Sequence, residues 1–180
     1  MTVKIITIDQ FNDGALNNLV TLLIDSVQSG ASVGFIAPLP RIDAVSYWLS
    51  VQNDLKERSR FMLIAIDENT DVNSKDSLEI LGSVQLSLCM KKNGLHRAEV
   101  EKLMVKSTHR GKGIATVLMN EIERLAKNNG RTLLVLDTRQ DDVASRLYTK
   151  LSYIEAGVIP QYALSSNGEL SGTTYFYKLL

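Results

Sequence analysis

Residues 100–115 read VEKLMVKSTHRGKGIA and join a strand-like run, residues 100–105, to a helix-like run, residues 116–127. Glycines at positions 111 and 113 allow the backbone to curl, so that successive N–H groups point inward. The first turn of the following helix adds free N–H donors and the positive end of the helix dipole. Because Arg110 and Lys112 add positive charge, the stretch predicts an anion site suited to a phosphate-bearing ligand.

The composition limits the class of ligand. A chain of 180 residues suffices for a single domain, residues 1–180, with a sizeable core. Lys and Arg together number 20, as do Asp and Glu, so the chain has no net field to hold nucleic acid or an anionic membrane. Recognition of a phosphate must therefore be local, and we expect neither nucleic acid nor a membrane as a partner.

The chain has few residues of the kinds that form disulfides or bind metals. Cys89 is the only cysteine, which excludes an internal disulfide, and the two histidines are too few for a zinc site, so we expect no metal. Residues 1–10 lack the apolar core of a signal peptide, and no segment approaches the length of a membrane span. We therefore expect a cytoplasmic protein.

Hydrophobic periodicity predicts the order strand, two helices, three strands, helix, strand, helix and two strands. We expect strands at residues 3–8, 61–66, 78–90, 95–105, 132–136, 153–156 and 174–180. We expect one helix capped by Asp13, others at residues 42–58 and 116–127, and a last one carrying Val143, Leu147 and Leu151. Asn93-Gly94 predicts a tight hairpin turn, and residues 67–77 a solvent loop. The sheet should be mixed, with residues 100–105 parallel to residues 132–136.

Two common phosphate-binding motifs do not fit the glycine-containing loop. A dinucleotide fingerprint needs a third glycine where Thr116 stands, and here the strand before the loop is the second arm of a hairpin. The chain also lacks the Gly-Lys-Ser/Thr ending of a nucleotide-hydrolase phosphate loop. A phosphate ligand of another kind is therefore expected.

Two separated segments resemble the GNAT N-acetyltransferase superfamily. Leu103-Met104-Val105 followed by residues 110–115 resembles its acetyl-CoA signature, Arg/Gln-x-x-Gly-x-Gly/Ala. Residues 141–153 resemble the helix and strand that flank the thioester in that superfamily. Within it, the chain is similar to the tabtoxin-resistance family, notably at residues 30–35, 85–89, 97–100 and 136–138.

This resemblance implies a fold and an activity. The fold is α/β (α+β), with a mixed, mostly antiparallel sheet of about seven strands splayed between two central strands and flanked by about four helices. The co-substrate is acetyl-CoA, and the reaction is direct transfer of its acetyl group to a primary amine of a small molecule, such as an amino-acid-like toxin, in a ternary complex. A protein or peptide N-acetyltransferase and a non-catalytic acyl-CoA-binding or regulatory domain stay open as alternatives, as do a monomer and a homodimer.

The same resemblance assigns residues to acetyl-CoA. The backbone of residues 103–105 would pair with the pantetheine arm as an added strand, and the loop would bind the phosphates. The implied cofactor-binding residues are Leu103, Met104, Val105, Arg110, Gly111, Lys112, Gly113, Ile114, Ala115, Ser145 and Tyr148.

The implied catalytic residues are two acids and a phenol. Tyr148 would protonate the departing thiolate, whereas Glu99 and Asp137 would bind the acceptor or take the proton of its amine, with their division of labour open. Because side chains alternate along a strand, Glu99, Glu101, Leu103 and Val105 should share one face. Phe35 and Trp48 are expected to line the acceptor pocket.

Overall fold

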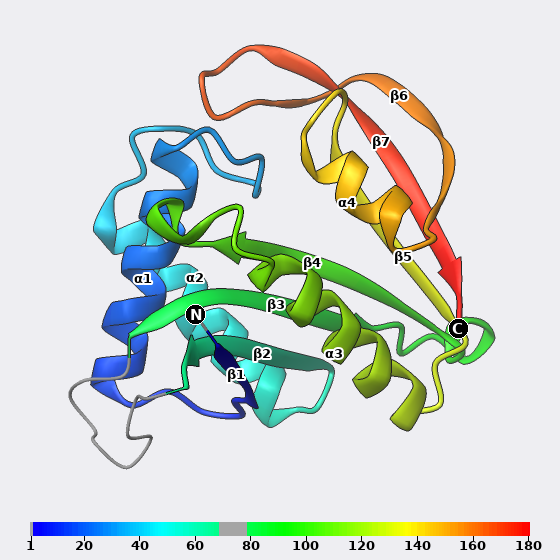
Figure 1. Cartoon of the computed structure of the whole chain (residues 1–180), viewed down its shortest axis with the longest axis horizontal. Helices are drawn as coiled ribbons and strands as arrows, with labels where there is room; N and C mark the ends of the chain where they lie inside the picture. Colours follow the sequence, from blue (N-terminus) through cyan, green and yellow to red (C-terminus); the bar gives the residue numbers. More distant parts are fainter. Residues whose placement is uncertain (1, 69–78) are drawn as a thin grey trace.

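The computed structural model describes residues 2–68 and 79–180 (Figure 1). Its strands are β1 (Val3–Thr7), β2 (Arg60–Asp67), β3 (Ile80–Leu88), β4 (Arg97–Val105), β5 (Leu133–Arg139), β6 (Ile154–Leu164) and β7 (Leu170–Leu179). Its α-helices are α1 (Asp13–Gln28), α2 (Arg41–Lys56), α3 (Ile114–Asn128) and α4 (Ala144–Lys150), and its 3₁₀ turns are η1 (Lys92–Gly94) and η2 (Ser107–His109). The predicted order of strands and α-helices is confirmed. The loop expected at residues 67–77 lies mostly outside the described residues.

Within the described residues, the strands form one seven-stranded sheet in the order β1-β2-β3-β4-β5-β7-β6. Neighbouring strands are antiparallel throughout, except that β4 and β5 are parallel. Parallel strands need a crossover, and α3 supplies it between β4 and β5. The predicted fold class, a mixed and mostly antiparallel sheet with flanking helices, is confirmed.

Helices cover both faces of the sheet (Figure 1). Helices α1 and α2 bury one core against the sheet, and α3 buries another on the opposite face. Fully burying a Leu or Ile side chain stabilises the fold by ~1.5–3 kcal/mol. The core beneath α1 and α2 includes Leu19, Leu23, Trp48, Met62, Ile64 and Met104. The core beneath α3 includes Leu86, Ala98, Val100, Leu118 and Ile122.

Strand β4 contains an extra residue relative to β3. Gln85 pairs with Glu101, but Ser83 pairs with Met104, so β4 advances by three residues where β3 advances by two. Lys102 lies within this bulge and has a left-handed backbone, with φ of 52°. A bulge of this kind reverses the alternation of side chains beyond it.

The bulge changes which residues share a face of β4. Met104 belongs to the core beneath α1 and α2, whereas Leu103 and Val105 pack against the core beneath α3. Glu99 lies before the bulge, next to Ala98 and Val100 of the α3 core, and so points to the opposite face from them. The prediction that Glu99 shares a face with Leu103 and Val105 is therefore wrong.

The two central strands separate soon after they meet. Strand β4 pairs with β5 only at residues 97–99, opposite residues 133–135. Strand β5 pairs along its whole length with β7, on its other edge. Beyond Glu99 the facing edges of β4 and β5 diverge, and this splay opens the centre of the sheet.

Three local expectations are corrected by the structure. Asn12, not Asp13, caps α1: its Oδ1 accepts from the Ala15 N–H at 2.8 Å. Asn93-Gly94 does not form a tight two-residue turn, since it lies in η1 with neither residue left-handed. Strands β6 and β7 are longer than expected, because two register shifts along their pairing interrupt the regular alternation on which the prediction rested.

Candidate active site

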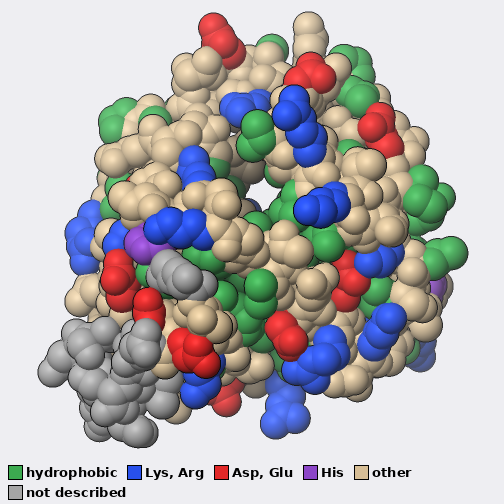
Figure 2. All heavy atoms as spheres, viewed as in Figure 1, with side chains coloured by type: hydrophobic (Ala, Val, Ile, Leu, Met, Phe, Trp, Pro, Cys, Tyr) green, Lys and Arg blue, Asp and Glu red, His purple; other side chains and the backbone are tan. Residues whose placement is uncertain are grey.

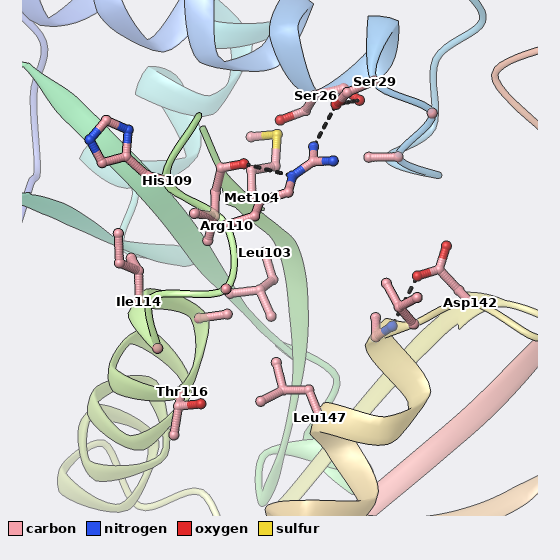
Figure 3. Close-up of a pocket in the computed structure, with 18 of the residues that line it drawn as sticks. Ser26, Ser29, Leu103, Met104, His109, Arg110, Ile114, Thr116, Asp142 and Leu147 are labelled. Atoms are coloured by element: carbon pink, nitrogen blue, oxygen red, sulfur yellow. Dashed lines mark hydrogen bonds between the residues drawn. The ribbon is translucent and has the colours of Figure 1, made fainter. Parts of the chain in front are cut away.

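The loop that precedes α3 is fixed to the end of α1. The backbone N–H and the hydroxyl of Ser107 both donate to the Asp25 carboxylate, at 2.7 and 2.6 Å. The Arg110 guanidinium donates to the Ser29 hydroxyl and, at 3.2 Å, to the Val105 carbonyl (Figure 3). These contacts hold the loop and its positive charge against the C-terminal end of α1.

The backbone of this loop is open to a ligand. Gly111 and Gly113 have φ of 76° and 83°, and no atom lies within 4 Å of the position that a Cβ would take at either residue. The N–H groups of residues 111–116 donate no hydrogen bond to another described residue. Consecutive free N–H groups at the start of a helix are suited to bind an anion, so the loop has the backbone geometry on which the predicted anion site depends.

A cavity of about 540 Å³ lies beside the loop. The end of α1, strand β4, the loop and the starts of α3 and α4 form its wall (Figure 3). Most of the predicted cofactor-binding residues lie in this wall: Leu103, Met104, Val105, Arg110, Gly111, Gly113, Ile114 and Ala115. Ser26 Oγ, from another residue of the wall, is buried and has no hydrogen-bond partner among the described residues. We call this space the loop cavity.

A second cavity, of about 380 Å³, contains all three predicted catalytic residues in its wall, Glu99, Asp137 and Tyr148. Glu101 and Lys102 of β4 also line it, and residues 162–164 of β6 contribute to it from the other side. Four side chains of the wall are carboxylates, those of Glu99, Glu101, Asp137 and Asp142, so the wall is mainly negative. We call this space the acidic cavity.

The two cavities meet where β4 and β5 diverge. Four residues line both of them: Ala31, Leu103, Asp142 and Ala144. The molecule is hollowed between β4 and α4, and Lys and Arg side chains gather around the rim (Figure 2). A ligand anchored at the glycine-containing loop can therefore reach toward the acidic cavity through the splay in the sheet.

The side chain of Arg139 links β5 to the end of α1 and to the start of α4, next to this junction. The Arg139 guanidinium, at the end of β5, donates to the Gly30 carbonyl at 3.3 Å and pairs with Asp142 at 3.0 Å. Asp142 also accepts from the Ala144 N–H at 3.0 Å and so caps the start of α4. Sequence reasoning missed both Arg139 and Asp142, although an acid two residues before a helical stripe is an N-cap signal.

Only two of the carboxylates in the acidic cavity are free of a salt bridge among the described residues. Glu101 pairs with Arg60 at 2.8 Å, whereas no salt bridge joins Glu99 or Asp137 to a described residue. Burial raises the pKa of the Glu99 carboxyl above its usual value, and the neighbouring carboxylates of Glu101 and Asp137 raise it further. Burial likewise raises the pKa of Asp137, although a hydrogen bond from Thr173 at 3.4 Å partly opposes the shift. Both groups are thereby better matched to proton transfer near neutral pH.

Tyr148 is held rigidly in the wall of the acidic cavity. Its ring packs against Tyr153 and Phe176, with centroids 5.9 and 5.7 Å away. Burial raises the pKa of the Tyr148 hydroxyl well above its usual value, and the carboxylates of Asp142 and Asp137 act in the same direction. The hydroxyl is therefore protonated at neutral pH, as a proton donor must be.

The remaining predicted residues lie apart from both cavities. Lys112 is exposed on the loop, outside the wall of the loop cavity, and Ser145 of α4 is in neither wall. Trp48 is fully buried in the core beneath α1 and α2, where its ring meets those of Phe11 and Tyr47. The expectation that Trp48 lines the acceptor pocket is corrected, since an aromatic residue at helical spacing packs the core here.

Phe35 is also outside both cavity walls. It lies on the segment between α1 and α2 and packs edge-on against Tyr47, with centroids 5.4 Å apart. The structure therefore places Phe35 against the core beneath α1 and α2, where it packs on the Tyr47 ring.

Comparison with known proteins identifies the family. Residues 35–153 match the model of the acetyltransferase (GNAT) family, so the chain belongs to that family. The fold also resembles ribosomal-protein-alanine N-acetyltransferase from Brucella melitensis, with a TM-score of 0.75, 18% identity and coverage of 100% of both chains.

Two further solved structures share this fold. A candidate phosphinothricin N-acetyltransferase has a TM-score of 0.76 at 20% identity, with 99% of each chain covered. A candidate acetyltransferase from Salmonella typhimurium, solved with its cofactor acetyl-CoA, has a TM-score of 0.74 at 16% identity, with 100% of this chain and 95% of that chain covered.

Two kinds of feature are absent from the described residues. No described helix has the length and apolar character needed to cross a membrane. Residues 2–68 and 79–180 contain no group of three or more His, Cys, Asp or Glu side chains placed to hold a metal ion.

The raised pKa of Glu99 predicts a dependence of stability on pH. Folding raises this pKa, so the folded protein binds the proton more tightly and loses stability as pH rises from the usual Glu pKa through the raised value. We expect Glu99→Gln to increase Tm at pH 7 by about 1–2 °C, a small effect because solvent screens this half-exposed group. The gain should disappear by about pH 3, where the carboxyl is protonated in both states.

Thermal unfolding at the two pH values measures this difference. Glu155→Gln, which changes an exposed carboxyl on β6, is the matched control and should show no such pH-dependent gain. A Tm for Glu99→Gln at or below that of the wild type at pH 7 would contradict the electrostatic account.

Proposed function

We propose that this protein transfers the acetyl group of acetyl-CoA to a primary amine of a small molecule, by direct attack in a ternary complex. One observation carries the proposal: the loop cavity and the acidic cavity meet at the splay between β4 and β5. The first suits the phosphates of CoA, and the second suits an amine, which is cationic at neutral pH. Their junction brings the two reactants together without a covalent enzyme intermediate.

The loop cavity has the donors that CoA requires. The free N–H groups of residues 111–116 and the Arg110 guanidinium suit the pyrophosphate. The β4 edge beyond Glu99 has no β5 partner, so its backbone can pair with the pantetheine arm as an added strand. Bound there, acetyl-CoA supplies the thioester whose acetyl group is transferred.

The acidic cavity supplies the proton transfers. An ammonium must lose a proton before it can attack, and Glu99 and Asp137 both have raised pKa values and no salt bridge to a described residue. Tyr148 is protonated and lines the same cavity, so its hydroxyl is the proposed acid for the departing thiolate. Glu101 is not proposed as a base, because it is paired with Arg60.

A small acceptor fits the enclosure of the acidic cavity better than a polypeptide does. The Ala37 N–H donates to the Ser166 carbonyl at 2.8 Å, which ties the segment between α1 and α2 to the turn between β6 and β7. Residues 162–164 of β6 also line the cavity. The similarity to a candidate phosphinothricin N-acetyltransferase supports a small-molecule acceptor. Together with the resemblance to the tabtoxin-resistance family, it favours a role in resistance to an amino-acid-like toxin in the cytoplasm.

The alternative is acetylation of a protein or peptide. It is favoured by the similarity to ribosomal-protein-alanine N-acetyltransferase from Brucella melitensis. A peptide needs an open groove, whereas the contact between Ala37 and Ser166 joins two segments whose neighbouring residues line the acidic cavity. A small molecule is therefore the better-supported acceptor.

Release of free thiol from acetyl-CoA tests the proposed function. We expect release to require both acetyl-CoA and an amine, when amino acids, simple amines and peptides are offered in parallel. Small amines should be acetylated at higher kcat/KM than peptides. Binding of acetyl-CoA with no turnover of any acceptor would instead establish a non-catalytic acyl-CoA-binding domain.

Gly113→Trp tests the assignment of the phosphate site. The new side chain would occupy the open space next to the loop, so we expect acetyl-CoA affinity to fall by more than about tenfold, the scale of one lost hydrogen bond to a charged group. Gly130→Trp is the matched control, because Gly130 has a similar φ of 71° and equally open surroundings but follows the far end of α3. Isothermal titration calorimetry gives both affinities, and equal values for two folded variants would refute the site.

Tyr148→Phe tests the acid. The change keeps the ring packing against Tyr153 and Phe176 and removes only the hydroxyl. We expect kcat to fall by roughly 10²-fold, the usual scale of general acid catalysis, with little change in acetyl-CoA affinity. Steady-state kinetics and titration of acetyl-CoA separate the two effects. If kcat is unchanged, Tyr148 serves only to pack α4 against the sheet.

A further inference from the structure

Lys102 occupies an unusual place in the acidic cavity. It lies within the β4 bulge with φ of 52°, a conformation that costs a residue other than glycine about 1–3 kcal/mol. The bulge puts its side chain in the wall of the acidic cavity, on the same strand as Glu99. Of the side chains that line this cavity in the described part of the chain, Lys102 is the only cationic one.

The ammonium of Lys102 is positioned by an aromatic ring and a glycine. Its Nζ lies 5.6 Å from the centre of the Tyr47 ring, within range of a cation–π interaction. It is also 3.5 Å from the position that a Cβ would take at Gly34, which is van der Waals contact distance, so the ammonium lies directly beside the backbone of Gly34. The Tyr47 ring is itself fixed by Phe35 and by a hydrogen bond from its hydroxyl to Gln85 at 3.1 Å.

The positioned ammonium has no anionic partner among the described residues. It forms no salt bridge and donates no hydrogen bond to any of them, although carboxylates line the same cavity. Glu101, its neighbour in sequence, is engaged by Arg60. Burial lowers the pKa of Lys102, and the Glu101 carboxylate only partly offsets this, so an anion bound beside it would favour its charged form.

We propose that Lys102 binds the carboxylate of a zwitterionic, amino-acid-like acceptor whose amine lies at Glu99 and Asp137. The inference rests on the proposed function and names the substrate class. The carboxylates of Glu99 and Asp137 and the ammonium of Lys102 line the same cavity, so they can pair with the ammonium and the carboxylate of one amino acid. A simple amine would pair with Glu99 and Asp137 but leave the Lys102 ammonium without an anionic partner, which disfavours binding of the amine.

Binding measurements on the full chain saturated with CoA test this inference. The probes are the common amino acids, together with diamino acids, each compared with its carboxamide, which keeps the amine and removes the negative charge. We expect each amino acid that binds to have an affinity at least about tenfold higher than that of its carboxamide. This is the scale of one hydrogen bond between charged groups. No acid bound more tightly than its carboxamide would overturn the proposal.

Variants of Lys102 separate a binding role from a structural one. Lys102→Met keeps most of the apolar stem and should reduce the preference for acids to less than about twofold to threefold, whereas Lys102→Arg keeps the charge and should retain it. Lys92→Met, an exposed change on η1, is the control and should leave the preference intact. A preference that survives Lys102→Met shows that Lys102 only balances the nearby carboxylates, and overturns the proposal.

Thiol release with the same probes distinguishes this inference from the proposed function. Tight, Lys102-dependent binding of acids without acetyl transfer would contradict the proposed function but support the carboxylate site at Lys102. Acetyl transfer to amines and carboxamides as readily as to acids would support the proposed function but contradict the carboxylate site.

Discussion

The short contact between β4 and β5 is the constraint on which the arrangement of this protein depends. The two strands pair at residues 97–99 and then diverge, while β5 continues to pair with β7. Backbone groups along the open edge of β4 consequently lack a strand partner, and buried peptide groups are costly when left unpaired. The splay is tolerated because β4 stays paired with β3 and β5 with β7 on their other edges, so that only the two facing edges are left open.

Several contacts hold the halves together across this splay. Arg139 joins the end of β5 to Gly30 after α1, and the Ala37 N–H reaches Ser166 at the turn between β6 and β7. These contacts come from segments far apart in the chain, and they lie next to the cavities rather than in the hydrophobic cores. The same segments therefore maintain the width of the splay and form the walls of the site.

The sequence predicted the parts of the site that depend on local chemistry. The glycine spacing at 111 and 113 indicated a loop with open N–H groups, and hydrophobic periodicity indicated α3 after it. The bulge at Lys102 could not be predicted in this way, because no glycine or proline marks it and strict alternation is the expected pattern of a strand. One inserted residue reversed the faces of Leu103 and Val105.

Other features depend on contacts between distant residues. The contacts of Arg139 with Asp142 and Gly30 form only because the sheet topology brings these residues together. Of the three, only Asp142 was marked in the sequence, as a possible N-cap. Trp48 shows the reverse case, since the sequence pattern of a large aromatic residue on a helix is equally compatible with a pocket wall and with a core. The structure shows that Trp48 is fully buried against Phe11 and Tyr47 and therefore belongs to the core.

The charges of the acidic cavity are destabilising in themselves. Burial and the crowding of carboxylates raise the pKa values of Glu99 and Asp137, and burial lowers the pKa of Lys102, so the folded chain disfavours the charged form of all three groups. In the proposed complex, the ammonium and the carboxylate of an amino-acid-like acceptor would place opposite charge beside these groups and offset the repulsion among them. Transfer of the ammonium proton to Glu99 or Asp137 would then neutralise a carboxylate whose charged form the cavity disfavours. The groups that destabilise the cavity are therefore the ones that the proposed reaction uses.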